Sequence, residues 1–245
     1  MNPFIIFIAA VVGYLMGSIS FARIVAGRVK PEADITKYVE PIPDSDLVYE
    51  DDAVSATLVN LNLGWQYGCL TSILDMIKVI VPMVAFKLIF PVQPYYLIVS
   101  AAALVGHNWP LYYHFKGGRG ESVVYGSMLI IDPLGAVVCN IAAVLLGLVV
   151  GQVHLVRWGG MALLIPWLWL RTNDPLMVVY IVFMNVVFWI AMSYDVKQYY
   201  LIYKQGVFKT QEQWSDFYDM SSGLGRFMDR YSLLALYKRM TGLNT

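Results

Sequence analysis

A glycine-rich stretch between residues 106 and 120 carries the clearest chemistry in the sequence. It reads Gly106-His107-Asn108-Trp109-Pro110, followed after four residues by Phe115-Lys116-Gly117-Gly118-Arg119-Gly120. Glycines let the backbone turn tightly and bring several N–H groups to one point, and Lys116 and Arg119 add positive charge. Because a helix start after the turn would add its dipole, the turn suits a phosphate group, although the P-loop spacing is absent. Plain loop chemistry at a positively charged membrane face is the alternative interpretation.

Two ionisable residues, Asp75 and Lys78, lie three positions apart inside an apolar segment and therefore share one helical face. Ionisable groups inside a membrane are costly, about 2.5–3.5 kcal/mol each, so they usually face the bundle interior and pair. The pattern fits either a structural ion pair or the lining of a polar substrate cavity. His107 fits either a group that orients a ligand at the loop or an interfacial histidine. The cysteine spacing matches no zinc or redox site, and the sequence predicts neither a metal nor a cofactor.

The composition indicates which elements must position these residues. Of the 245 residues, 58% are hydrophobic and only 14% are charged, whereas soluble domains have about 45–50% and about 25%. The 17 basic and 17 acidic residues cancel, which gives no field to attract nucleic acid. We expect an all-α, polytopic membrane bundle of about seven transmembrane helices, at about 20 residues each. The predicted spans are residues 3–27, 66–90, 93–113, 120–132, 133–151, 155–171 and 175–195.

The basic residues orient these spans. With the N-terminus outside, nearly all lysines and arginines outside the spans fall on the inner face, so the C-terminus is predicted to be cytoplasmic. Residues 1–197 are predicted to form the transmembrane domain, in which 29–57 is expected to be an acidic cytoplasmic loop, since its prolines argue against one long helix. Residues 198–245 are predicted to form a cytoplasmic amphipathic tail, in which Thr210–Gln213 resemble a capping box. The tail either lies in the headgroup layer, basic side toward anionic lipid, or docks on the bundle or a partner.

Three stretches together resemble one family. The segment 106–120 is similar to the second motif of the bacterial acyl-phosphate-dependent glycerol-3-phosphate acyltransferases, G-H-x-x-P-x-x-x-x-F-K-G-G-K-G-V-A-T. Gly17-Ser18-Ile19-Ser20 resembles that family's G-S-I-[PS], and Asp75-x-x-Lys78 with Pro82 resembles its D-x-x-K with a nearby proline. The resemblance covers roughly residues 8–196 in order and spacing. It implies transfer of an acyl group from acyl phosphate to sn-glycerol 3-phosphate in phospholipid biosynthesis, at the cytoplasmic face of the bacterial inner membrane.

The resemblance also implies roles for individual residues. Acyl phosphate, glycerol 3-phosphate and membrane lipids are the implied partners, with other lipid-synthesis proteins as a further option. The implied catalytic residues are His107, Lys116 and Arg119, and the implied substrate-binding residues are Gly117, Gly118, Gly120, Ser18, Thr57, Lys78 and Asp75.

The sequence departs from the family pattern at several places, among them Glu121-Ser122-Val123 in place of V-A-T. Arg119 replaces a lysine, and arginine presents a wider planar fork. The first motif, S-G-N-x-G-x-T-N, falls on residues 51–58 and shares only Thr57, while the third, H-x-x-N, falls on 193–196 and shares neither marker. These departures motivate an alternative function, a non-catalytic relative that binds lipid or scaffolds other lipid enzymes.

Overall fold

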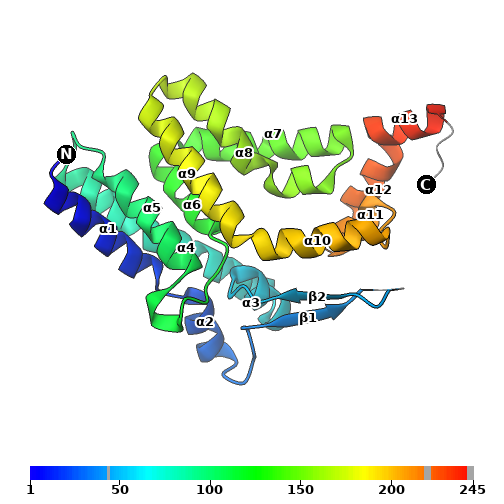
Figure 1. Ribbon diagram of the computed structural model, residues 1–245, viewed down its shortest axis with the longest axis horizontal. Helices are drawn as coiled ribbons and strands as arrows, with labels where there is room; N and C mark the ends of the chain where they lie inside the picture. Colours follow the sequence, from blue (N-terminus) through cyan, green and yellow to red (C-terminus); the bar gives the residue numbers. More distant parts are fainter. Residues whose placement is uncertain (43–44, 218–221, 242–245) are drawn as a thin grey trace. The chain divides into compact units, whose positions relative to one another are not determined.

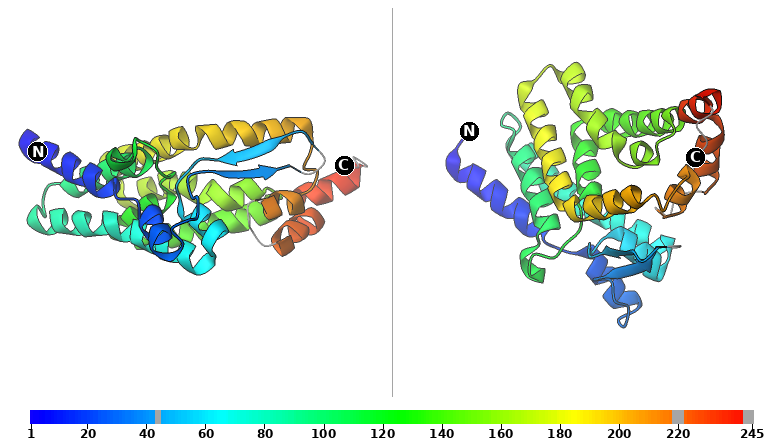
Figure 2. Two further views of the ribbon diagram at one scale, coloured as in Figure 1. Left: turned by 90° about the horizontal axis from the view of Figure 1, so that it is seen from below. Right: turned by 45° about the vertical axis from the view of Figure 1, so that its right-hand side comes forward.

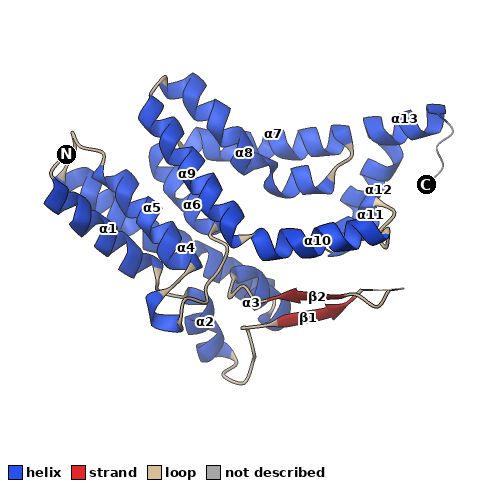
Figure 3. Ribbon diagram, viewed as in Figure 1, coloured by secondary structure: helices blue, strands red, loops and turns tan. Residues whose placement is uncertain are grey.

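The computed structural model describes residues 1–42, 45–217 and 222–241. Within these residues, the regular structure is helical except for one two-stranded hairpin (Figures 1 and 3). The chain divides into two compact units. Unit 1 contains residues 1–41, 48–133 and 179–196, and unit 2 contains 42–47, 134–178 and 197–245.

Unit 1 contains the segments on which the three family motifs fall, together with Asp75 and Lys78. Its elements are α1 (Pro3–Gly17), α2 (Phe21–Val29), β1 (Tyr38–Pro41), β2 (Val48–Asp51), α3 (Ala56–Leu63), α4 (Trp65–Ile89), α5 (Tyr95–Asn108), the 3₁₀ turn η1 (Leu111–Tyr113), α6 (Glu121–Ile131) and most of α9 (Pro175–Ala191).

Small residues let α1 and α5 pack backbone to backbone in this unit. A Cβ added at Gly13 would meet the carbonyl oxygen of Val99, and one at Gly106 would meet that of Tyr14. Close approach of this kind is typical of membrane helices. There the hydrophobic effect does not drive helices together, and small residues allow the close van der Waals packing that does. The Tyr14 hydroxyl also donates to the carbonyl of Trp109 at 2.9 Å, so α1 holds the C-terminal end of α5 directly.

The acidic segment 29–57 forms more structure than the predicted loop. Tyr38 pairs with Asp51 and Pro41 with Val48 in an antiparallel ladder (Figure 2). The Ser55 side chain then accepts from the N–H of Leu58 at 3.3 Å and caps α3. The hairpin therefore fixes the position of residues 51–55 and of the start of α3.

Unit 2 contains the elements of the C-terminal region and two long apolar helices. They are α7 (Pro133–Val150), α8 (Val153–Thr172), the start of α9, most of α10 (Ser193–Gln205), α11 (Gln211–Phe217), α12 (Ser222–Tyr231) and α13 (Leu233–Thr241).

The tail packs on α8 within this unit. The capping box is confirmed, because the N–H of Gln213 donates to Thr210 Oγ1 at 3.2 Å and the N–H of Thr210 donates to Gln213 Oε1 at 3.1 Å. The Gln211 side chain accepts from the N–H of Val153 at 2.9 Å, and the ring of Trp214 lies 4.9 Å from that of His154. Docking of α11 on the helical core, one of the two interpretations of the tail, is therefore observed.

Several helices are suited to a membrane. Among the residues that the structure describes, four spans are long and apolar enough to cross one: Pro3–Val29, which contains α1 and α2, together with α4, α7 and α8. The pair α9 and α10, bent by 61°, would make a fifth if it counts as one span. The predicted spans 93–113 and 120–132 correspond to α5 and α6, of 14 and 11 residues, which are shorter than an ordinary spanning helix.

Candidate active site

The loop between η1 and α6 needs glycines because neighbouring atoms leave no room for a Cβ. A Cβ at Gly117 would meet the carbonyl oxygen of His107, and one at Gly118 would meet its imidazole Nε2. Gly120 has φ +89° and caps α6, and a Cβ there would meet the side chain of Leu104. The loop is therefore packed directly onto the end of α5.

Much of the loop backbone is already hydrogen bonded. The N–H of Gly118 donates to the carbonyl of His107 at 3.1 Å, and the N–H of Lys116 donates to that of Tyr113 at 3.1 Å. The carbonyl of Gly117 accepts from the N–H of Val54 at 3.0 Å. The expected display of several free N–H groups is wrong for Lys116 and Gly118, because these two groups satisfy carbonyls of the chain itself.

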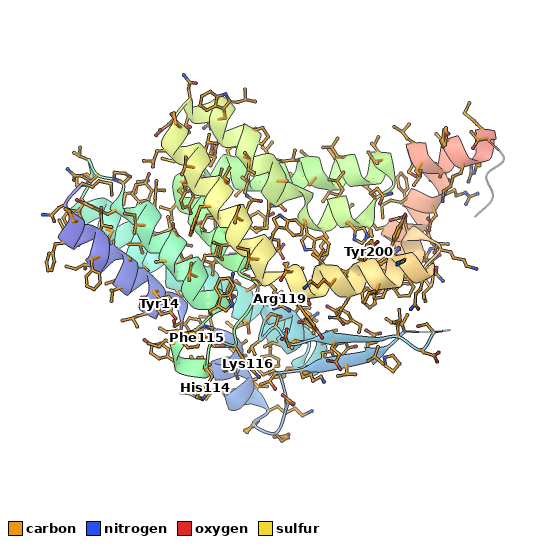
Figure 4. All side chains as sticks on the ribbon, in the orientation of Figure 1. Tyr14, His114, Phe115, Lys116, Arg119 and Tyr200 are labelled. Atoms are coloured by element: carbon orange, nitrogen blue, oxygen red, sulfur yellow. The ribbon has the colours of Figure 1, made fainter. Side chains whose placement is uncertain are left out.

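Lys116 carries a positive charge on the loop that is not paired with a carboxylate among the described residues. Its side chain is exposed and has no ion pair or hydrogen bond among the residues that the structure describes. The backbone of Lys116 is engaged instead, since its carbonyl accepts from the Arg23 guanidinium at 3.1 Å. Figure 4 shows Lys116 and Arg119 on the loop that precedes α6. A free ammonium beside a fixed loop can receive an anion from solvent at little reorganisation cost.

Three polar side chains, which we call the buried trio, lie under this loop: Asp75, Lys78 and His107. The Lys78 ammonium lies 2.7 Å from Asp75 Oδ1 and 2.8 Å from His107 Nδ1, and it donates to the carbonyl of Ile19 at 2.7 Å. The predicted ion pair is therefore confirmed. Because an ammonium only donates, Nδ1 of His107 accepts, which leaves the proton on Nε2, the atom that faces Gly118.

A second group of charges, which we call the Arg119 network, comprises Arg119, Asp51, Asp52 and Asp195. Arg119 Nε donates to Asp195 Oδ2 at 2.6 Å, and its Nη2 donates to Asp195 Oδ1 at 3.1 Å, a bidentate pair. Nη2 also donates to Asp52 Oδ1 at 2.9 Å and lies 3.7 Å from Asp51 Oδ1. Within the described residues, no set of three or more His, Cys, Asp or Glu side chains is placed to hold a metal ion.

The Arg119 network holds more negative than positive charge. Burial opposes the charge of Arg119, but its hydrogen bonds and ion pairs with the aspartates raise its pKa overall. Burial raises the pKa of Asp51 to about 6, and the charge of Asp195 adds to the rise. Arg119 is therefore a fixed cation whose charge is already compensated, and any added anion must compete with a carboxylate.

The structure brings together the segments on which the three family motifs fall. Residues 51–52, the loop 116–120 and residue 195 meet at Arg119. Ser18 is buried, its hydroxyl donates to the carbonyl of Tyr14 and it accepts from the N–H of Leu111, so it supports the turn after α5. Thr57 is exposed on α3, with no side-chain bond to the loop among the described residues.

Sequence reasoning missed two residues of this site. Asp195 stands where the third motif lacks its markers, and nothing local in the sequence points to its pairing with Arg119. Asn108 is 4% exposed, and neither polar atom of its side chain has a hydrogen-bond partner among the described residues. It lies against Gly120. Its place in the G-H-N sequence before the loop was the available signal.

Comparisons with known proteins agree on one family. The model of the family described as glycerol-3-phosphate acyltransferase matches residues 7–199. A glycerol-3-phosphate acyltransferase from Halalkalibacterium halodurans is 31% identical over 133 residues, which are 54% of this chain and 59% of that protein. One from Legionella pneumophila is 32% identical over 118 residues, 48% of this chain and 38% of that protein. The chain thus spans between two fifths and three fifths of these relatives' length.

The fold has a solved counterpart. PlsY (YgiH), an integral membrane glycerol 3-phosphate acyltransferase in its glycerol 3-phosphate form, superposes with a TM-score of 0.67 at 20% identity. The match covers 80% of this chain and 92% of that one. At this identity the likeness establishes the fold, and the site must be judged from the residues described above.

Proposed function

Since the chain belongs to the glycerol-3-phosphate acyltransferase family, we propose that it transfers an acyl group from acyl phosphate to glycerol 3-phosphate or a related acceptor. The observation that carries the proposal is the meeting of three motif segments at Arg119, beside a loop whose Lys116 is a free cation. The relatives that match this chain are named as transferases, which favours catalysis over a purely scaffolding role.

The proposed setting is a bacterial inner membrane. Seven spans, an N-terminus outside and a cytoplasmic C-terminus would place the loop 116–120 at the cytoplasmic face, where water-soluble acceptors arrive. The apolar helices and the distribution of basic residues support this arrangement. The tail after residue 197, whose α13 carries an exposed apolar face, would lie in the headgroup layer of the membrane.

The chemistry asks little of a general base. The acceptor hydroxyl oxygen attacks the acyl carbon, the bond between that carbon and the phosphate oxygen breaks, and phosphate leaves with the electron pair and takes up the hydroxyl proton. An acyl phosphate is already activated, so the protein mainly holds two anions close and offsets their charge. Lys116 is the proposed partner of the leaving phosphate, and His107 supports the loop that carries it, because its carbonyl accepts from the N–H of Gly118 and its imidazole packs against that glycine.

Arg119 is the proposed partner of the acceptor. Its Nη2 is shared with Asp52, whose side chain is 65% exposed, whereas Asp195 is 3% exposed and held bidentately. An incoming phosphate would therefore displace Asp52 rather than Asp195. Asp51 and Asp52 disfavour a dianion here, so a related acceptor with less negative charge fits the same site.

The test is direct. The purified full chain, given acyl phosphate and radiolabelled glycerol 3-phosphate, should form lysophosphatidic acid. Lys116→Ala and Arg119→Ala should each abolish the product, while Arg28→Ala, which removes an exposed cation of α2, should leave the rate within about twofold. No product above background with glycerol 3-phosphate or with a panel of alternative acceptors would overturn catalysis.

A further inference from the structure

A cleft in unit 2 is lined by none of the residues to which the proposed function assigns a role. It has a volume of about 210 Å³ and is lined by residues of the tail together with Gly151. The polar residues that line it are Lys209, Thr210, Gln211, Asp229, Ser232, Lys238 and Arg239. All belong to unit 2, so the cleft is complete within it.

The cations of the cleft are uncommitted. In the ranges that the structure describes, the side chains of Lys209, Lys238 and Arg239 make no ion pair or hydrogen bond. By contrast, Arg226 nearby on α12 is paired with Glu212 at 2.7 Å. The tail thus satisfies one of its cations and leaves those of the cleft open.

The other polar groups of the cleft offer donors. The Thr210 and Ser232 oxygens accept from the N–H groups of Gln213 and Ala235, which leaves each hydroxyl proton to be donated. The carboxylate of Asp229 is already engaged, because its oxygens accept from the N–H groups of Gln211 and Glu212 at 2.8 and 2.9 Å. Three cations and two hydroxyls against one engaged carboxylate make an anion site.

Size and orientation narrow the ligand. Pockets for drug-sized ligands measure about 300–1,000 Å³, so this cleft suits a phosphate group with a small substituent. On α13, Leu234, Ala235 and Lys238 face the cleft. The exposed residues Leu233, Leu236, Tyr237 and Met240 repeat at helical spacing on the opposite side. An apolar face seated on a membrane would therefore turn the cleft toward water.

We infer that this cleft binds a small, water-soluble phosphate-bearing anion. The choice of a soluble ligand over a lipid headgroup rests on the proposed position of the tail at the membrane surface. The inference does not depend on acyl transfer. The binding itself follows from the unpaired cations and hydroxyl donors.

Equilibrium dialysis of the full chain in uncharged detergent, with radiolabelled inorganic phosphate, tests the inference. The double variant Lys238→Gln/Arg239→Gln should weaken phosphate binding to the cleft at least tenfold, because each charge-assisted hydrogen bond contributes about tenfold or more. The matched double variant Lys197→Gln/Lys204→Gln removes the same charge from exposed positions of α10 and should change it less than about twofold.

Each contrary outcome is decisive. An equal loss in both double variants would reduce the effect to general charge, and no loss in either would leave the cleft without a ligand of this class. A third arm adds phosphatidylglycerol in mixed micelles. If Lys238→Gln/Arg239→Gln weakens lipid binding while leaving inorganic phosphate binding unchanged, the soluble ligand is overturned in favour of a headgroup.

Discussion

The buried trio and the Arg119 network both contact the segment 106–120, but they differ in burial and in charge balance. In the trio, Asp75 and Lys78 are each 2% exposed and neutralise each other. In the network, one guanidinium faces three carboxylates, and the Asp52 side chain is largely exposed. A buried pair whose charges balance fixes structure. An exposed network whose charges do not balance can exchange one of its partners for a ligand.

The difference also separates retained from altered chemistry. The trio occupies positions that keep the family pattern, whereas the network lies in motif segments where that pattern is altered. The family residues are therefore retained in the buried trio, which shapes the loop. They are altered around Arg119, which is proposed to bind the acceptor. The following variants break or sharpen this contrast.

Lys78→Met should have the largest effect. It leaves the Asp75 carboxylate buried without its ammonium, and breaking one side of a buried pair costs about 3–5 kcal/mol. Thermal unfolding in detergent measures the loss. The double variant Asp75→Asn/Lys78→Met should lose less than Lys78→Met alone, and Lys87→Met, at an exposed position of the same helix, should cost under about 1 kcal/mol. Equal losses at positions 78 and 87 would contradict a buried structural pair.

Asp51→Asn tests the unbalanced side through pH. Burial raises the pKa of Asp51 from 3.8 to about 6, so the folded state holds a proton that the unfolded state has lost between these values. The stability from that proton is complete below about pH 4 and is lost as pH rises through about 6. At about 1.4 kcal/mol per pH unit, the wild type should lose up to about 3 kcal/mol over this range that the variant keeps. Parallel denaturant-unfolding profiles of the two proteins would contradict it.

Gly118→Ala tests how tightly the trio holds the loop. The added Cβ meets the His107 imidazole, and overpacking of this kind costs about 1–3 kcal/mol. Gly27→Ala is the matched control, because a Cβ there meets nothing within 4 Å and alanine favours the α2 helix. The unfolding midpoints of the two variants should therefore move in opposite directions. A neutral Gly118→Ala would show that the loop is not packed on His107.

Hydropathy, charge and spacing predicted the elements well. The apolar runs coincide with α4, α7 and α8, the capping box at Thr210 opens α11, and the spacing of Asp75 and Lys78 predicted their pair. These features depend on residues within a turn or a span of one another. Such local relations can be seen directly in a sequence.

The Arg119 network could not be predicted in the same way. Asp195 lies 76 positions from Arg119, and Asp52 lies 67 positions away on the other side. Their meeting depends on the hairpin and on the start of α10, and the sequence predicted only that the first and third motifs fall on residues 51–58 and 193–196. The glycines were likewise interpreted as free backbone donors, because a sequence does not show that His107 fills the space above Gly118.

Asp52→Asn should have the smallest effect on folding and a specific effect on substrate. The Asp52 carboxylate is an exposed partner of Arg119, so its loss should change stability by under about 1 kcal/mol. If the acceptor phosphate replaces Asp52 at Nη2, removal of this competitor should lower KM for glycerol 3-phosphate about two- to fivefold and leave kcat unchanged. Asp46→Asn, at an exposed position before β2, is the matched control and should leave both constants unchanged. A raised KM in Asp52→Asn would mean that the Asp52 carboxylate helps to bind the acceptor. It would contradict the proposal that the acceptor phosphate displaces Asp52 from Arg119.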